Sequence, residues 1–218
     1  MENSVQKHAD AELQKSGALN TARIQSLGDN IFGFAMTLLV LNFLVPELGH
    51  GNPLGEELLA LGLNFLTYMM SFIVLGIMWV SQQNQYHFIE RSDRFFLWIN
   101  IFFLSCVVFV PFSTHVLALY YQSTLAVVLY GVNLLVCGAL LYFHWSYATT
   151  NRRLVSEDLG ERIVHLVKFR FLLIIAWVSV AVLISFVSIP VAFLLFVPGM
   201  ILGMMPAVMD RLAHRWLS

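Results

Sequence analysis

Six long apolar segments, separated by shorter polar stretches, dominate the pattern of the chain. Each is about 20 residues long, the length that a helix rising about 1.5 Å per residue needs to cross a hydrocarbon core about 30 Å thick. The pattern predicts an all-α, polytopic membrane protein with six transmembrane helices. The predicted spans are Ile31 to Leu48, Leu58 to Ser81, Phe95 to His115, Thr124 to Tyr147, Leu166 to Phe186 and Pro190 to Met209.

The polar stretches divide the chain into a short tail and one membrane domain. Residues 1–20 are polar, mixed in charge and without the apolar core of a signal peptide, so we expect a flexible cytoplasmic tail. Residues 21–218 then form a single six-helix transmembrane domain. The main charged loop is 151–168, where a short amphipathic helix is consistent with the near-helical spacing of Leu154, Leu159, Ile163 and Leu166.

The basic residues supply an independent test of the number of spans. Cytoplasmic loops of membrane proteins carry most of the Lys and Arg. Six spans place all twelve basic residues on one face, whereas five or seven spans would put one group on the wrong side. Both termini are therefore predicted to be cytoplasmic. The four groups are Lys7, Lys15 and Arg23; Arg91 and Arg94; Arg152, Arg153, Arg162, Lys168 and Arg170; and Arg211 and Arg215.

Composition agrees with a chain that has lipid as its solvent. The sequence is 59% hydrophobic and 11% charged, with a mean hydropathy of +0.76, whereas soluble domains are roughly 25% charged. The net charge of -1 and the lack of a basic stripe argue against nucleic acid as a partner. Cys106 and Cys137 both fall inside apolar spans, where we interpret them as core thiols.

Motifs for catalysis are missing from the sequence. It has no HExxH, no GxSxG and no Gly-rich phosphate loop, so we predict neither an enzyme nor a bound cofactor. The seven histidines are scattered along the chain, which is typical of interfacial or capping residues rather than of metal ligands at regular spacing.

The first span contains the most unusual combination of residues. Asp29 directly precedes the apolar run, where it either complements the dipole at a helix N-terminus or belongs to a paired polar network. On a helical wheel one narrow stripe contains Phe34, Leu38, Leu41 and Val45. Thr37 lies at its margin and Asp29 on nearly the opposite side. In an apolar helix the residues of such a stripe more often pack against neighbouring helices than line a pore.

This helix resembles the signature of the transmembrane protein 175 family of cation channels, in which an Arg and a Phe-Ser-Asp triplet precede an apolar helix with a Thr-Leu-Leu core. Two motifs depart from the pattern: Leu27-Gly28-Asp29 replaces Phe-Ser-Asp, and Gln82-Gln83 replaces a His pair. The matching residues are Arg23, Asp29, Phe32, Ala35, Thr37, Leu38 and Leu39, then Ser71, Phe72 and Trp79, then Asn100, Leu104, Pro111, Phe112 and Ser113.

The resemblance implies a homotetramer in which residues 21–218 form a channel domain and the first helix of each subunit lines a central pore. It implies a potassium-permeable channel of a prokaryotic plasma membrane, with potassium ions passing through and no cofactor. Rings of Phe34, Leu38 and Leu41 would form a hydrophobic gate that closes by dewetting, with Thr37 as a further pore contact. The residues expected to hold the pore helix in place are Arg23, Asp29, Trp79 and Asn100.

Two other classes of membrane protein stay open at this point. A secondary transporter would need broken helices and a polar binding site near mid-membrane. Pro198 and Pro206 interrupt the sixth span, but no clear acid or base accompanies them in the membrane interior. A non-conducting scaffold protein would pass no ions at any potential.

Overall fold

A computed structural model describes residues 21–41 and 62–204 of the chain. Within these ranges the structure is all-helical, with six α-helices, one 3₁₀ turn and a single isolated bridge between Ile89 and Val155. This confirms the predicted six-helix, all-α class. The elements are α2 (Thr21–Val40), α4 (Gly62–Phe88), α5 (Arg94–Leu119), α6 (Thr124–Thr149), η1 (Thr150–Arg152), α7 (Glu161–Ile184) and α8 (Ile189–Met204).

The lengths of the helices largely match the predicted spans. Four of them, α4 to α7, are long and apolar enough to cross a membrane, and α8 contributes a shorter apolar stretch, Ile189–Ile201. Helix α2 begins at Thr21, well before the predicted start at Ile31, because the polar residues ahead of the apolar run are also helical. The predicted tail 1–20 and the predicted span ends at 42–48, 58–61 and 205–209 lie outside the described residues.

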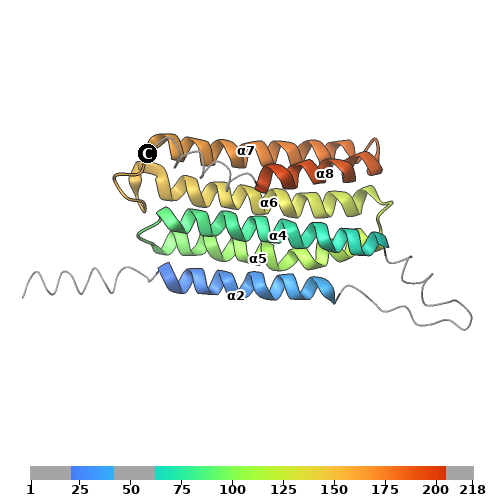
Figure 1. The fold of residues 1–218 in the computed structure, drawn as a ribbon, viewed down its shortest axis with the longest axis horizontal. Helices are drawn as coiled ribbons and strands as arrows, with labels where there is room; N and C mark the ends of the chain where they lie inside the picture. Colours follow the sequence, from blue (N-terminus) through green and yellow to red (C-terminus); the bar gives the residue numbers. More distant parts are fainter. Residues whose placement is uncertain (1–20, 42–61, 205–218) are drawn as a thin grey trace, which may run out of the picture.

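The helices lie side by side along one long axis (Figure 1). Helix α6 occupies the middle and packs against both α5 and α7, and α8 packs against α7 and α4. Helix α2 lies at the edge of the bundle, where it packs against α4 and α5. The arrangement therefore leaves one side of α2 uncovered by the other described helices.

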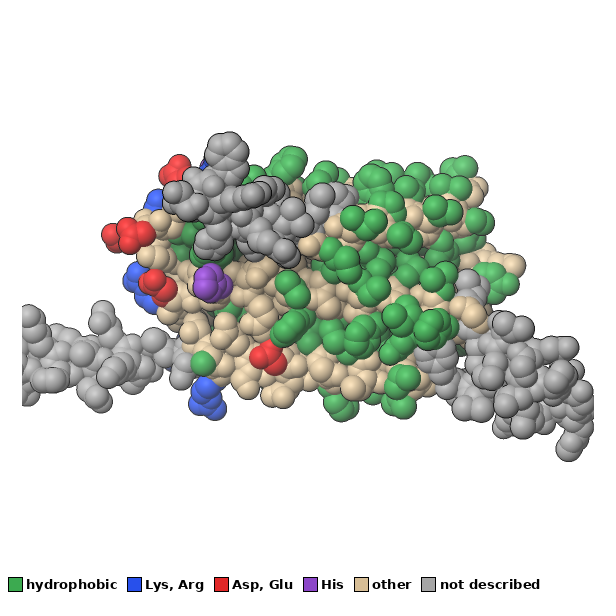
Figure 2. Space-filling view, in the orientation of Figure 1, with side chains coloured by type: hydrophobic (Ala, Val, Ile, Leu, Met, Phe, Trp, Pro, Cys, Tyr) green, Lys and Arg blue, Asp and Glu red, His purple; other side chains and the backbone are tan. Residues whose placement is uncertain are grey.

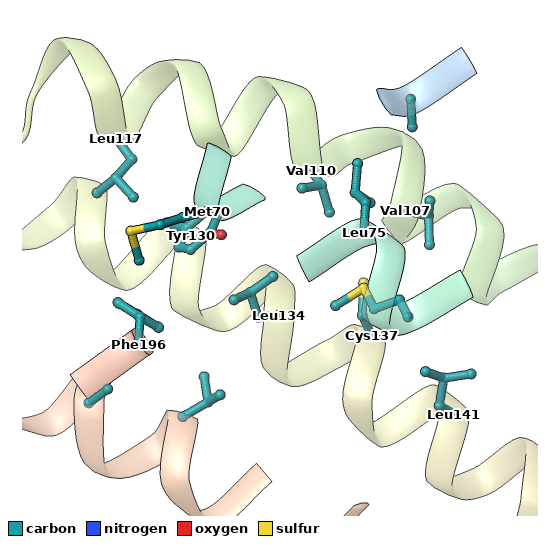
Figure 3. Close-up of a cluster of buried hydrophobic side chains, with 14 of the residues drawn as sticks. Met70, Leu75, Val107, Val110, Leu117, Tyr130, Leu134, Cys137, Leu141 and Phe196 are labelled. Carbon is teal, nitrogen blue, oxygen red and sulfur yellow. The ribbon is translucent and has the colours of Figure 1, made fainter. Parts of the chain in front are cut away.

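Buried apolar side chains form two clusters. The larger one includes residues from all six helices, and Figure 3 shows part of it, where Met70, Leu134, Cys137 and Phe196 lie between neighbouring helices. The smaller one lies where the α4–α5 and α6–α7 connections meet. It consists of Ile24, Tyr86, Ile89, Phe96, Trp145, Ala148, Leu154, Val155 and Leu159.

The segment between η1 and α7 is irregular, and the amphipathic helix considered for it was wrong. Leu154 and Leu159 are buried in the smaller cluster, but the next helix begins only at Glu161. The backbone N–H groups of Glu90 and Arg91 both donate to the Leu154 carbonyl, so this segment is held against the α4–α5 connection. Its apolar spacing reflects individual buried side chains rather than one face of a helix.

Charged and apolar side chains are separated along the long axis. Figure 2 shows most of the hydrophobic side chains of this face away from the end where α2 begins and most of the charged ones near that end. The α4–α5 and α6–α7 connections lie at that same end. The described basic groups in these connections therefore lie together, as the one-sided charge pattern predicts.

Candidate pore helix and its anchor

One face of α2 is buried against the bundle. Its buried residues recur every three or four positions, which brings them onto one side of the helix. The Phe32 ring lies 6.0 Å from the Phe103 ring of α5, measured between centroids. This face holds α2 against α4 and α5. Its members are Ile24, Gly28, Phe32, Ala35 and Leu39.

The predicted stripe lies on the other face of α2. Phe34 is 65% exposed and Leu41 is 68% exposed, while Leu38 is half-buried at the edge of the face. Packing within the subunit therefore does not account for Phe34 and Leu41. Thr37 is exposed as well, and its hydroxyl donates to the Phe34 carbonyl at 2.8 Å. Since that bond uses its only proton, Thr37 can offer a passing cation oxygen lone pairs.

Asp29 links α2 to α4 through two hydrogen bonds. Its Oδ1 accepts from Trp79 Nε1 at 2.7 Å and from Gln83 Nε2 at 2.5 Å. Trp79 and Gln83 are four positions apart on α4, so they project from the same side of that helix. The first turn of α2 contains no acidic residue, which shows that the helix-dipole interpretation of Asp29 was wrong. We refer to Asp29, Trp79 and Gln83 as the anchor.

A buried amide pair lies next to the anchor. Gln82 Nε2 donates to Asn100 Oδ1 of α5 at 2.7 Å, and both side chains are 1% exposed. A Cβ atom added at Gly28 would lie 3.0 Å from Gln82 Oε1, closer than most such contacts in proteins. Gly28 therefore lets the α2 backbone approach the amide pair. Gly28 and Gln82, one from each motif that departs from the family pattern, therefore lie close together.

Of the four residues predicted to hold the pore helix, three lie close together in the structure and one does not. Asp29 and Trp79 are in direct contact, and Asn100 lies beside them through Gln82. Arg23 is exposed, and six helical positions turn it about 120° away from Asp29. The sequence pattern did not assign partners to the two glutamines. Their spacing from Trp79, three and four positions along α4, is the signal that could have done so.

A second polar cluster lies buried between α4, α5 and α6. The Thr114 hydroxyl donates to Ser71 Oγ at 2.9 Å, and Ser71 Oγ lies 3.1 Å from the Tyr130 hydroxyl. All three side chains are at most 3% exposed. Because buried hydroxyls are costly without partners, this chain of hydrogen bonds ties the three helices together at a defined register.

Asn133 of α6 supports α5 just before its internal proline. Oriented so that both of its amide atoms have partners, its nitrogen donates to the Cys106 carbonyl at 3.2 Å. Its oxygen accepts from the Val110 N–H at 3.3 Å and from the Ser113 hydroxyl at 3.1 Å. Pro111 has no N–H and weakens the helical ladder at this point. The Asn133 amide reinforces the turn that the proline weakens.

Together the fold and the site define a polytopic α-helical membrane protein whose peripheral helix is anchored by one face and exposes Phe34 and Leu41 on the other. The TMEM175 family, described as endosomal/lysosomal potassium channels, matches residues 23–111. The matched region begins at Arg23 in α2 and ends at Pro111 in α5. It therefore contains the anchor, the amide pair and the exposed stripe.

Relatives extend the similarity over most of the chain. A potassium channel of Chamaesiphon minutus is 31% identical over 180 residues, 74% of this chain and 89% of the relative. A potassium channel of Streptomyces collinus is 28% identical over 174 residues, 78% of this chain and 84% of the relative. The chain belongs to the TMEM175 family, whose members are channels and not enzymes.

The fold agrees with a solved structure of the same family. The crystal structure of a lysosomal potassium-selective channel TMEM175 homolog from Chamaesiphon minutus superposes with a TM-score of 0.75 at 28% sequence identity. The alignment covers 84% of this chain and 96% of that one. Both chains therefore share one helical architecture over nearly the whole length of the solved protein.

Proposed function

We propose that this chain forms a homotetrameric, potassium-permeable channel of a plasma membrane, with its termini in the cytoplasm and α2 of each subunit lining a central pore. The relatives described as potassium channels support conduction of potassium. The observation that carries the pore assignment is the outward stripe of α2, in which Phe34 and Leu41 are each about two-thirds exposed. The grouping of basic residues supports the orientation.

The gate in this proposal consists of stacked apolar rings. Four copies of Phe34, Leu38 and Leu41 would surround the pore axis, one from each subunit. A narrow apolar constriction excludes water and with it a hydrated ion, so small changes in its radius open or close the path. Thr37, the exposed hydroxyl of the stripe, would provide an oxygen contact between the rings.

The anchor has the role of setting the rotation of the pore helix. Each residue of an α-helix turns it by about 100°, so a modest rotation would exchange Phe34 for a neighbour at the pore axis. Asp29 accepts two hydrogen bonds from α4, and the Gln82–Asn100 pair lies against the same turn of α2 at Gly28. These contacts lie one to two turns before the stripe and fix which side chains face outward.

A planar-bilayer recording in a potassium gradient tests the proposal directly. Leu38→Ala removes most of one gate ring and is expected to give a leakier pore with altered selectivity. Val40→Ala is the matched control, because Val40 is an exposed aliphatic residue of α2 that lies outside the stripe. It should leave conductance unchanged.

The recording also separates the competing classes of membrane protein. A well-assembled protein that passes no current at any potential would identify a scaffold and overturn the proposal. Slow, saturable flux without channel-sized currents would identify a secondary transporter. Unchanged conduction in a well-expressed Leu38→Ala variant would remove Leu38 from the gate.

A further inference from the structure

A small apolar cavity lies between α4, α6, α7 and α8, in a part of the subunit that the proposed pore does not use. Its volume is about 70 Å³. The wall consists of aliphatic, aromatic and methionine side chains, and Figure 3 shows some of them between α4, α6 and α8. Representative wall residues are Met70, Met78, Leu134, Phe171, Val178 and Phe196.

The chemistry of the wall favours hydrocarbon over water. Among the described wall residues only Ser81 and Tyr130 carry polar side-chain groups, and the Tyr130 hydroxyl already contacts Ser71. A buried water needs two to four polar partners, and apolar cavities of about 150 Å³ stay dry and bind benzene. A cavity of half that size suits a short length of an alkyl chain.

A positive charge stands at one end of the cavity. Arg170 Nη2 donates to the Ser81 hydroxyl at 3.3 Å, and the Arg170 guanidinium lies 5.0 Å from the ring centroid of Phe171. Both Ser81 and Phe171 line the cavity. Arg170 belongs to α7, a helix apolar enough to cross the membrane, and a cation at such a position is a candidate functional residue.

We propose that the cavity binds the hydrocarbon chain of an anionic amphiphile, whose carboxylate or phosphate head lies against the Arg170 guanidinium. The planar fork of N–H donors in a guanidinium matches the oxygens of either head group. Helix α7 begins at the charged end of the bundle, and Arg170 follows nine positions later. A long side chain at that depth reaches toward the head-group region of the lipid, as snorkelling Arg residues do.

Photolabelling of the purified full-length protein in phosphatidylcholine nanodiscs tests this site without measuring any current. The probes are stearic acid with a diazirine at mid-chain, and phosphatidylglycerol and phosphatidylcholine that each carry the same chain. We expect both anionic probes to label wall methionines such as Met78 and Met200, and excess unlabelled stearate or phosphatidylglycerol to compete. The neutral probe should label them several-fold less. Stronger labelling by stearate identifies a free fatty acid, and stronger labelling by phosphatidylglycerol identifies a lipid.

Two pairs of variants locate the chain and the head. Val178→Phe fills the cavity and should lower wall labelling about tenfold, whereas Val180→Phe on the exposed side of the same helix should not. Arg170→Gln should lower labelling by the anionic probes about tenfold, the loss of roughly one charged contact, and Arg170→Lys should retain most of it.

Several outcomes would overturn the site. Labelling of the wall that no unlabelled amphiphile competes away, or that is equal in Val178→Phe and Val180→Phe, would show nonspecific contact with lipid. Equal labelling by the neutral probe together with an unaffected Arg170→Gln variant would refute the anionic head. If Val178→Phe does not elute as folded protein, competition on the unmodified protein decides the question.

Discussion

Helices α2 and α6 are held in the bundle in opposite ways. Helix α6 lies between α5 and α7, and at Gly131 the helices are so close that an added Cβ would lie 2.2 Å from Val182 Cγ2. Helix α2 lies at the edge, and an added Cβ at its Gly33 would find no heavy atom within 4 Å. Helix α6 packs closely between two neighbours, although Val132 and Phe143 on it are exposed, whereas α2 packs against the bundle on one side only.

The two helices differ in the contacts that hold them, and this difference distinguishes a helix that supports the fold from one that is available for function. Both helices bury apolar side chains, but α6 also contributes Tyr130 and Asn133 to buried hydrogen bonds with neighbouring helices. Helix α2 is linked by hydrogen bonds at Asp29 and keeps Phe34 and Leu41 outside. A helix held on one side can change its contacts without unfolding the bundle, which suits a pore-lining element.

The largest expected effect is at the tightest contact of α6. Gly131→Ala forces Val182 away, and because a β-branched side chain has few rotamers, we expect a loss of about 2–3 kcal/mol in stability. The matched change in α2, Gly33→Ala, should stabilise by about 0.5–1 kcal/mol through helix propensity alone. Thermal unfolding in detergent measures both. Equal effects at the two glycines would remove the contrast between the helices.

A somewhat smaller effect is expected where α6 supports α5. Asn133→Ala removes the amide that bonds the Cys106 carbonyl and the Val110 N–H, at a cost of about 2 kcal/mol. Asn30→Ala on the exposed face of α2 is the control and should change stability by less than about 0.5 kcal/mol. The same unfolding measurement applies. A neutral Asn133→Ala would show that Pro111 needs no support from α6.

A substitution in the anchor of α2 should change the stability of the protein less than it changes the assembly of the oligomer. Asp29→Asn keeps one acceptor oxygen but loses the charge, so we expect a loss of about 1 kcal/mol, modest because Asp29 is exposed in the subunit. Because we propose that the anchor orients the pore helix, we also expect a lower yield of assembled oligomer, measured by size-exclusion chromatography. Wild-type yield and oligomer size would contradict this role for Asp29.

The smallest expected effect is the coupling between Gly28 and Gln82. Gly28→Ala alone increases helix propensity but also brings the new Cβ into a steric clash with the Gln82 amide. In a Gln82→Ala background that clash is gone, so the same change should be more favourable by about 0.5–1 kcal/mol. A double-mutant cycle of unfolding free energies measures the difference. Additive changes would show that the two residues do not constrain each other.

Much of the fold could be predicted because it follows from local properties of the chain. The six helices and the membrane class follow from segment length and hydropathy, which depend on residues close together in sequence. The early start of α2 at Thr21 was missed because its first turns are polar, and hydropathy detects the apolar part of a helix rather than the helix itself. The amphipathic helix predicted around Leu154 and Leu159 was wrong for a related reason. Single buried side chains in an irregular segment can have the same spacing as one face of a helix.

The candidate site could be predicted only in part. The resemblance identified Asp29 and Trp79, but their hydrogen bond joins residues 50 positions apart, and local pattern contains no information on such a distance. The roles of Gln82 and Gln83 also depend on how α2 packs on α4. The gate residues Phe34, Leu38 and Leu41 remain a prediction that the proposed recordings test.

Hydropathy along the sequence is enough to predict a membrane protein of six helices, and the positions of the basic residues predict its orientation, because hydropathy and charge act residue by residue. The tertiary structure decided which face of α2 is anchored and which is free. Core, lipid and pore all accept apolar side chains, so periodicity alone does not separate them. Only the packing of α2 on α4 and α5 brings Asp29 within hydrogen-bond distance of Trp79 and Gln83 and leaves Phe34 and Leu41 exposed.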